Sequence, residues 1–185
     1  SAVIVFADAD LAQAGRRGLS GAISVSGQGC VNGTRLLVER SIYEQYLGIL
    51  QTIAGYIPVG DPLDPATVMG PLISAASLQR ILGAIEQASA DGARLVFGGQ
   101  RLDGARADGF FLPITLFADV DHGSALAQQE VFGPVLSLTP FDTEDEAIAL
   151  ANATDYGLGA YIHTADLRRA HHVAERHARE YDRQG

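Results

Sequence analysis

The chain has 185 residues, of which 47% are hydrophobic and 19% are charged, as in ordinary soluble globular proteins. Its formal net charge of −9 argues against a nucleic-acid surface, which requires a basic patch. A single cysteine excludes an internal disulfide, and no apolar run approaches the roughly 18 residues that span a bilayer. Because the sequence also shows no signal peptide, we expect one domain in the reducing cytoplasm, without membrane contact.

Strand and helix patterns alternate along the chain. The predicted strands cover residues 3–6, 36–38, 94–97, 112–117, 135–141 and 160–163. The predicted helices cover residues 11–23, 42–57, 74–90, 144–153 and 166–180, with Asp8 or Asp10 capping the first. Strands separated by helices predict an α/β fold, an open, mainly parallel, twisted sheet with helices on both faces. In such sheets, sites gather at the carboxyl ends of the strands, where we expect this one.

The most informative residue is Cys30, the only cysteine. It lies in the glycine-rich stretch GQGCVNG, which begins at Gly27 and precedes the strand at 36–38. This setting predicts an exposed turn between a helix and a strand, where a thiolate could reach a bound substrate. The alternative is a small, inert hydrophobic side chain, since buried thiols without chemistry are common.

Five short stretches occur in an order typical of one enzyme family. They are VIVFADADL from Val3, GQGC from Gly27 with Arg35 downstream, VGDPLD followed by MGPLI from Val59, EVFGPV from Glu130, and AN followed by YGL from Ala151. Together they resemble the catalytic domain of the aldehyde dehydrogenase superfamily over most of the chain. The resemblance implies that residues 1–185 form one catalytic domain, truncated at both ends, that lacks the cofactor-binding domain.

The resemblance also implies roles for individual residues. Cys30 takes the place of the nucleophile that forms a thiohemiacetal with an aldehyde, passes hydride to NAD or NADP, and leaves a thioester that water hydrolyses to the acid. The backbone N–H of Cys30 would donate to the developing oxyanion. Glu130 matches the residue that accepts hydrogen bonds from the nicotinamide ribose, and Phe132 matches the aromatic ring beside that ribose.

Two departures from the family pattern bear on these expectations. Ser24 and Val25 stand where the family commonly has phenylalanine and asparagine, near the expected substrate. The general base and the dinucleotide-binding domain of the family have no counterpart in these residues. We therefore expect the parent enzyme, a homodimer or homotetramer, to oxidise an aldehyde, and the 185 residues alone to be inactive.

Two other functions remain open at this point. The same thioester chemistry would serve a CoA-acylating or esterase-like enzyme. A non-catalytic scaffold or interaction domain is the third possibility, but Cys30 together with Glu130 and Phe132 argues against it. No set of histidines and cysteines has the spacing of metal ligands, so no metal site is expected. The sequence identifies neither the aldehyde nor the choice between NAD and NADP.

Overall fold

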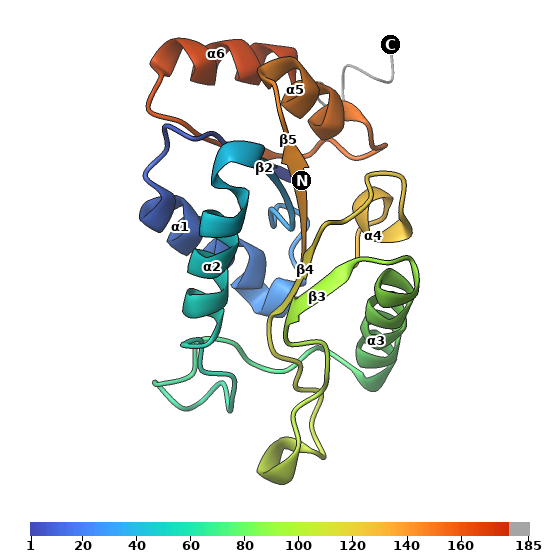
Figure 1. Cartoon of the computed structure of the whole chain (residues 1–185). Helices are drawn as coiled ribbons and strands as arrows, with labels where there is room; N and C mark the ends of the chain where they lie inside the picture. The colour runs from blue at the N-terminus through green and yellow to red at the C-terminus, as the bar shows by residue number, and fades with distance from the viewer. Residues whose placement is uncertain (178–185) are drawn as a thin grey trace.

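The computed structural model describes residues 1–177, which arrange strands and helices around one sheet (Figure 1). The strands are β1 (Ala2–Val5), β2 (Arg35–Glu39), β3 (Arg94–Phe97), β4 (Thr115–Ala118), β5 (Val135–Phe141) and β6 (Ala160–His163). The α-helices are α1 (Leu11–Ile23), α2 (Tyr43–Ala54), α3 (Ala75–Ala90), α4 (Ala125–Gln128), α5 (Glu144–Asn152) and α6 (Leu167–Arg176). Short 3-10 helices cover Ser24–Gly27, Arg40–Ile42 and Gly104–Arg106.

The six strands form one sheet in the order β3-β4-β5-β2-β1-β6. Every neighbouring pair is parallel except β3 and β4, which are antiparallel. All four residues of β1 are buried, because this strand lies inside the sheet and is covered on both faces. Such double coverage explains its unbroken apolar sequence. The predicted α/β fold with a mainly parallel sheet is therefore confirmed.

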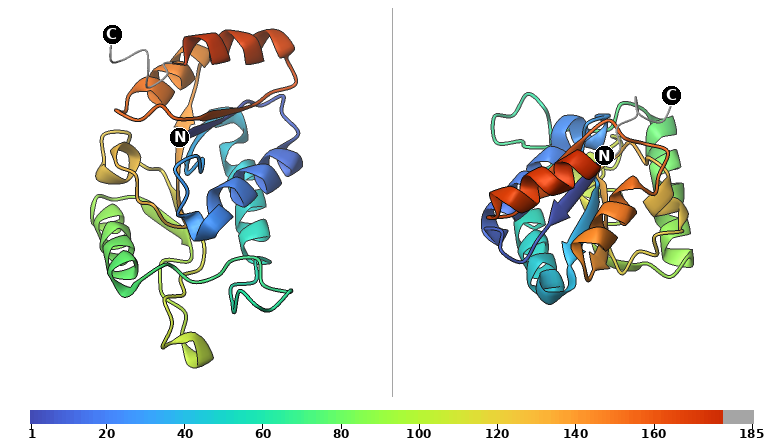
Figure 2. Two further views of the ribbon diagram at one scale, coloured as in Figure 1. Left: turned by 180° about the vertical axis from the view of Figure 1, so that it is seen from behind. Right: turned by 90° about the horizontal axis from the view of Figure 1, so that it is seen from above.

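Helices cover both faces of the sheet (Figure 2). Val3 and Val5 of β1 belong to the apolar cluster that includes buried residues of α1 and α2. Ala2 and Ile4 belong to a second cluster on the opposite face, with residues of α5 and Val173 of α6. Helices α3 and α4 cover that same opposite face beside β4 and β5. The alternation along β1 thus assigns α1 and α2 to one layer and the other helices to the second.

Side-chain caps fix where several helices begin. Asp10, rather than Asp8, caps α1 by accepting a hydrogen bond of 2.9 Å from the Gln13 amide. Ser74 caps α3 and Thr143 caps α5 in the same way, each through the amide of the residue three positions later. Asp166 caps α6. These residues satisfy amides that the first helical turn leaves without partners.

Some observed element boundaries differ from the predicted ones. The strand predicted from Leu112 begins at Thr115, because Pro113 has no amide hydrogen. Helix α2 ends at Ala54 before Gly55 and does not reach Ile57. The part of the last helix predicted for residues 178–180 lies outside the described residues. No described helix has both the length and the apolarity needed to cross a membrane.

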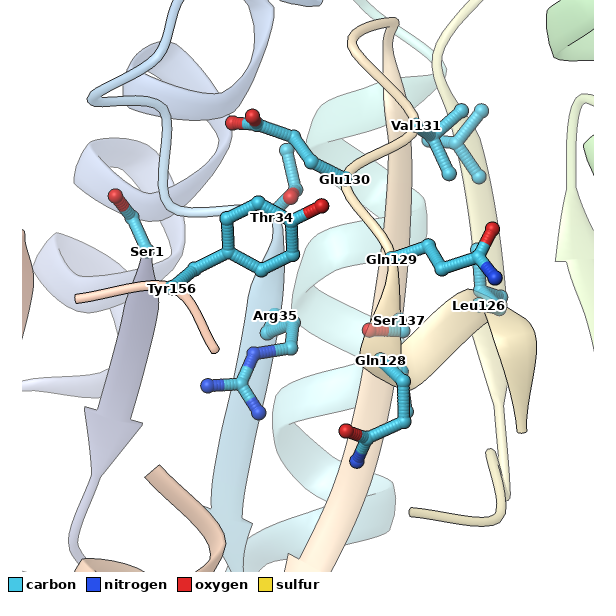
Figure 3. A pocket seen from close by; sticks show the side chains of 12 residues that line it. Ser1, Thr34, Arg35, Leu126, Gln128, Gln129, Glu130, Val131, Ser137 and Tyr156 are labelled. Carbon is cyan, nitrogen blue, oxygen red and sulfur yellow. The ribbon is translucent and has the colours of Figure 1, made fainter. Parts of the chain in front are cut away.

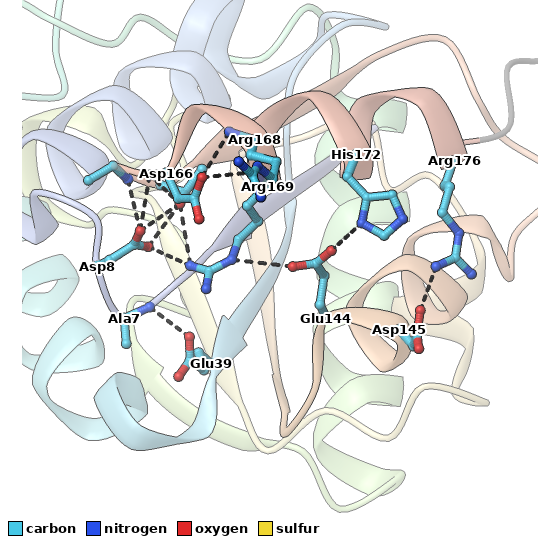
Figure 4. A network of polar contacts seen from close by, with 12 residues as sticks. Ala7, Asp8, Glu39, Glu144, Asp145, Asp166, Arg168, Arg169, His172 and Arg176 are labelled. Carbon is cyan, nitrogen blue, oxygen red and sulfur yellow. Dashed lines mark hydrogen bonds and ion pairs between the residues drawn. The ribbon is translucent and has the colours of Figure 1, made fainter.

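A polar network at the carboxyl end of β1 holds α5 and α6 in place (Figure 4). Asp8 accepts hydrogen bonds from the Thr164 hydroxyl and from the Ala165 and Asp166 amides, and pairs with Arg169 at 2.9 Å. Arg169 also contacts Glu144 at 3.3 Å. Burial alone would raise the pKa of Asp8, but the bond from Thr164 and the charge of Arg169 hold that pKa below its ordinary value of 3.8. The described contacts of Asp8 thus tie helices to the sheet.

Candidate active site

The candidate residues lie at the amino ends of the parallel strands, opposite the end where we predicted them. Cys30 precedes β2, whereas Glu130 and Phe132 precede β5. Because β2 and β5 are parallel neighbours, the loops that enter them meet at the same edge of the sheet. The carboxyl ends carry the Asp8 network instead. The general rule for open α/β sheets therefore does not locate these residues.

Cys30 occupies an exposed turn between α1 and β2, as the sequence predicts. The turn is closed by a hydrogen bond of 3.1 Å from the Asn32 amide to the Gly29 carbonyl, which leaves Cys30 at its corner. The Cys30 amide donates no hydrogen bond to another described residue. The thiol is therefore accessible to a bound molecule, and the neighbouring N–H is not already used.

The Asn32 side chain anchors this turn to the end of α1. This side chain is buried, with an exposed fraction of 5%, and donates to the Ser24 carbonyl at 2.9 Å and to the Ala22 carbonyl at 3.4 Å. These carbonyls belong to the end of α1 and the residue after it, where helical partners run out. Asn32 thus joins the Cys30 turn to the end of the preceding helix.

The closest link between the two candidate loops is a contact between glycines. A Cβ atom on Gly27 would lie 2.2 Å from the Gly133 carbonyl carbon and 2.3 Å from the Pro134 nitrogen. Gly27 also has a φ of 76°, a left-handed conformation that favours glycine. The sequence separates these segments by about a hundred residues, yet their backbones touch here. Only a residue without a side chain permits that approach.

Two further residues before Gly27 adopt the left-handed conformation. Val25 has φ 53° and ψ 39°, and Ser26 has φ 55° and ψ 37°. A β-branched residue is an outlier in this region, so Val25 stores strain beside the candidate nucleophile. Asparagine, which the resemblance places at this position in the family, tolerates the left-handed region far better.

We therefore expect Val25→Asn to raise the free energy of unfolding by about 1 kcal/mol. The side chain is 72% exposed, so the replacement loses little packing. Urea unfolding followed by circular dichroism measures the effect. Val68→Asn is the matched control, because Val68 is 60% exposed and has no positive φ. Equal stability of the two variants would contradict the assigned strain.

Side chains on both sides of Gly27 connect the Cys30 loop to the segment before α3. The Ser26 hydroxyl donates to the Gly70 carbonyl at 3.0 Å. The Gln28 side chain accepts from the Ile73 amide at 3.1 Å and donates to the Val25 carbonyl at 3.3 Å. The MGPLI stretch recognised in the sequence thus supports the loop that carries Cys30.

Glu130 lies at a pocket between the loops that enter β2 and β5 (Figure 3). The pocket is lined by Ser1, Thr34, Arg35, Leu126, Ala127, Gln128, Gln129, Glu130, Val131, Val135, Ser137 and Tyr156. In Figure 3 the exposed carboxylate of Glu130 points to the side of Thr34 and Tyr156, whereas Val131 points the other way. Neither Cys30 nor Phe132 lines this pocket. A carboxylate in this position can accept hydrogen bonds from ligand hydroxyls.

Phe132 is held by its backbone rather than by its ring. Its φ of 54° is left-handed, and its side chain is 41% exposed. From α3, the Arg80 guanidinium donates to the Val131 carbonyl and, at 3.3 Å, to the Phe132 carbonyl. An exposed aromatic ring on a strained, pinned backbone suits contact with a ligand better than core packing.

Arg35 links the start of β2 to the end of α5. Its guanidinium donates to the Leu150 carbonyl at 3.2 Å and the Ala151 carbonyl at 2.9 Å. A cation at a helix carboxyl terminus complements the helix dipole as well as the carbonyls there. Arg35 therefore supports the wall of the Glu130 pocket.

Several supporting residues have no sequence signal that reveals their role. The side chains of Asn32, Arg80 and Tyr161 contact backbone carbonyls of the candidate loops, and such contacts leave no motif. Tyr156 belongs to the YGL stretch, and its ring lines the Glu130 pocket. An exposed residue next to a motif is a weak signal, so only the fold identifies these partners.

Comparison with known proteins identifies the class to which this fold and these loops belong. The model of the aldehyde dehydrogenase family matches residues 1–179. The chain belongs to the aldehyde dehydrogenase family.

Particular relatives narrow the comparison. The chain is 50% identical over 173 residues to a betaine aldehyde dehydrogenase of Cereibacter sphaeroides, covering 94% of this chain and 35% of that protein. It is 46% identical to betaine aldehyde dehydrogenase 1 of Rhizobium meliloti, covering 95% of this chain and 36% of that protein. The chain thus spans about a third of the length of these curated relatives.

Solved structures agree on the fold. An aldehyde dehydrogenase of Mycobacterium tuberculosis complexed with NAD+ is 43% identical, with a TM-score of 0.92, covering 95% of this chain and 36% of that one. An apo betaine aldehyde dehydrogenase of Staphylococcus aureus with a BME-modified cysteine is 36% identical, with a TM-score of 0.95. That match covers 97% of this chain and 36% of the solved chain.

Proposed function

We propose that these residues form the catalytic domain of an enzyme that oxidises an aldehyde to a carboxylic acid, with Cys30 as the nucleophile. The observation that carries the proposal is the contact of Gly27 with Gly133 and Pro134. It joins the exposed thiol turn to the loop of Glu130 and Phe132, as a shared site requires. A scaffold domain would need none of these strained, exposed positions.

The chain's own groups account for the covalent part of the reaction. The Cys30 thiolate adds to the aldehyde carbon, and the carbonyl electron pair moves to the oxygen, next to the open Cys30 N–H. Loss of hydride from this thiohemiacetal leaves a thioester on sulfur. Water then attacks the thioester, and the acid and the thiolate separate.

The residues at the Glu130 pocket are of the kind that can hold the ribose of a dinucleotide. The Glu130 carboxylate is exposed, lies at the pocket and can accept hydrogen bonds from ribose hydroxyls, while Phe132 presents an exposed ring on the adjoining backbone. When bound, a nicotinamide dinucleotide supplies the hydride acceptor. We propose NAD, because a family member of the same fold is complexed with NAD+.

Betaine aldehyde is the substrate we propose to test first, since relatives at 46–50% identity carry that name. Assembly of the parent enzyme into a homodimer or homotetramer stays a proposal as well.

Differential alkylation tests the proposal directly. We expect iodoacetamide to modify Cys30 in the folded 185-residue chain, because the thiol is exposed. Excess betaine aldehyde should slow that modification by occupying the sulfur as a thiohemiacetal, whereas the alcohol choline should not. The adduct is counted by mass spectrometry, and the single cysteine makes the count unambiguous.

Two results would contradict the proposed role. One is a thiol that iodoacetamide does not reach in the folded chain, and the other is equal labelling with betaine aldehyde and choline. NADH absorbance provides a separate check: these 185 residues alone should form no NADH at a useful rate, because they span about a third of the relatives' length.

A further inference from the structure

Three successive carbonyl groups of the Cys30 turn each accept a hydrogen bond, two of them from distant parts of the chain. The Gly29 carbonyl accepts from the Asn32 amide at 3.1 Å. The Cys30 carbonyl accepts from the Ser1 hydroxyl at 3.3 Å, and the Val31 carbonyl accepts from the Tyr161 hydroxyl at 2.8 Å. The last of these bonds reaches across 130 positions of sequence.

Tyr161 reaches the turn because the chain crosses over β1. In the sheet, β1 lies between β2, which follows the turn, and β6, which carries Tyr161 opposite Val3. At the crossing, a Cβ on Gly33 would lie 2.4 Å from Val3 Cγ2 and 3.1 Å from Tyr161 Cδ2. The backbone therefore rests directly on these two side chains, and the phenol extends beyond it to the Val31 carbonyl.

We propose that Tyr161 is a positioning residue for Cys30, an inference that rests on the proposed function. Its hydroxyl fixes the peptide that follows Cys30, while the buried Asn32 side chain fixes the turn to the end of α1. With both anchors in place, the thiol and the N–H of Cys30 keep a fixed orientation relative to each other. The described hydrogen bond of the phenol is to the Val31 carbonyl, so its effect on the sulfur passes through the backbone.

Tyr161→Phe removes only the hydroxyl, and because the ring is 44% exposed the variant should fold. Losing one hydrogen bond should let the turn open more often, so hydrogen exchange of the Asn32 amide should accelerate about fivefold. Exchange of the β1 and β2 amides should not change. Tyr56→Phe is the matched control, because Tyr56 is 82% exposed and its hydroxyl donates no hydrogen bond to a described residue.

Alkylation of the same variants by iodoacetamide across pH supplies a readout that a purely structural role would not move. We expect Tyr161→Phe to lower the limiting rate several-fold, since a turn that opens more often holds the thiolate toward the reagent for less of the time, without moving the midpoint of the pH profile. The proposal is overturned if Asn32 exchanges in Tyr161→Phe as in the parent, if β1 and β2 exchange accelerates equally, or if only the midpoint moves. Failure of the proposed function is a different result, an unreactive Cys30 in the parent chain.

Discussion

Gly27→Ala is expected to lower the free energy of unfolding by about 3 kcal/mol or more. The new Cβ would lie 2.2 Å from the Gly133 carbonyl carbon, a contact with backbone that no rotamer change relieves. The residue also has a φ of 76°, where alanine is strained whatever the space. In the alanine variant the two loops must move apart to make room for the new methyl group. Urea unfolding measures the resulting loss in the free energy of unfolding.

Gly21→Ala is the matched control for this prediction. Gly21 is an exposed residue of α1, and no atom lies within 4 Å of its added Cβ. Alanine has a higher helix propensity than glycine, so the free energy of unfolding of this variant should rise by about 0.5–1 kcal/mol. If Gly27→Ala were as stable as Gly21→Ala, the close approach of the two loops would be wrong.

Cys30→Ala is expected to lower kcat for NAD-dependent aldehyde oxidation at least about 10³-fold, because no covalent intermediate can form. The measurement needs a protein that carries this chain together with a dinucleotide-binding domain, with NADH absorbance as the signal. The change should appear in kcat, since the thiol is needed for chemistry more than for binding.

Val31→Ala provides the comparison for the cysteine variant. Val31 is the next residue, is 51% exposed, and contributes its carbonyl rather than its side chain to the described hydrogen bonds of the turn. We expect its kcat to stay within a few-fold of the parent enzyme. Comparable losses in both variants would indicate a general disturbance of the turn and would contradict a specific role for the thiol.

Much of the fold could be predicted because its signals are local. The apolar run of β1, the spacing of apolar residues in α3 and the caps Ser74 and Thr143 are each visible within a few residues. The short helix α4 could not be predicted, because four residues are too few to show a helical period. The later start of β4 follows from a local signal, Pro113, that the strand predicted from Leu112 ignored.

The candidate site could be predicted in part. Cys30 lies in a glycine-rich stretch that by itself predicts an exposed turn, whereas the role of Glu130 rests on the family resemblance. The loops that carry these residues meet because β5 and β2 are neighbours in the sheet and because Gly27 lies directly against Gly133. Neither fact is visible in the sequence. The left-handed Val25 contradicts local propensity, so sequence rules that reward typical conformations miss it.

Acyl transfer to Cys30 tests most directly whether the folded turn makes this thiol a nucleophile. The folded chain is treated with p-nitrophenyl acetate, and acetylation of Cys30 is followed by mass spectrometry beside the same chain unfolded in urea. We predict one acetyl group on Cys30, formed faster in the folded chain than in urea, and none at this position in Cys30→Ala. Acetylation of the folded thiol that is no faster than that of the unfolded one would contradict the account.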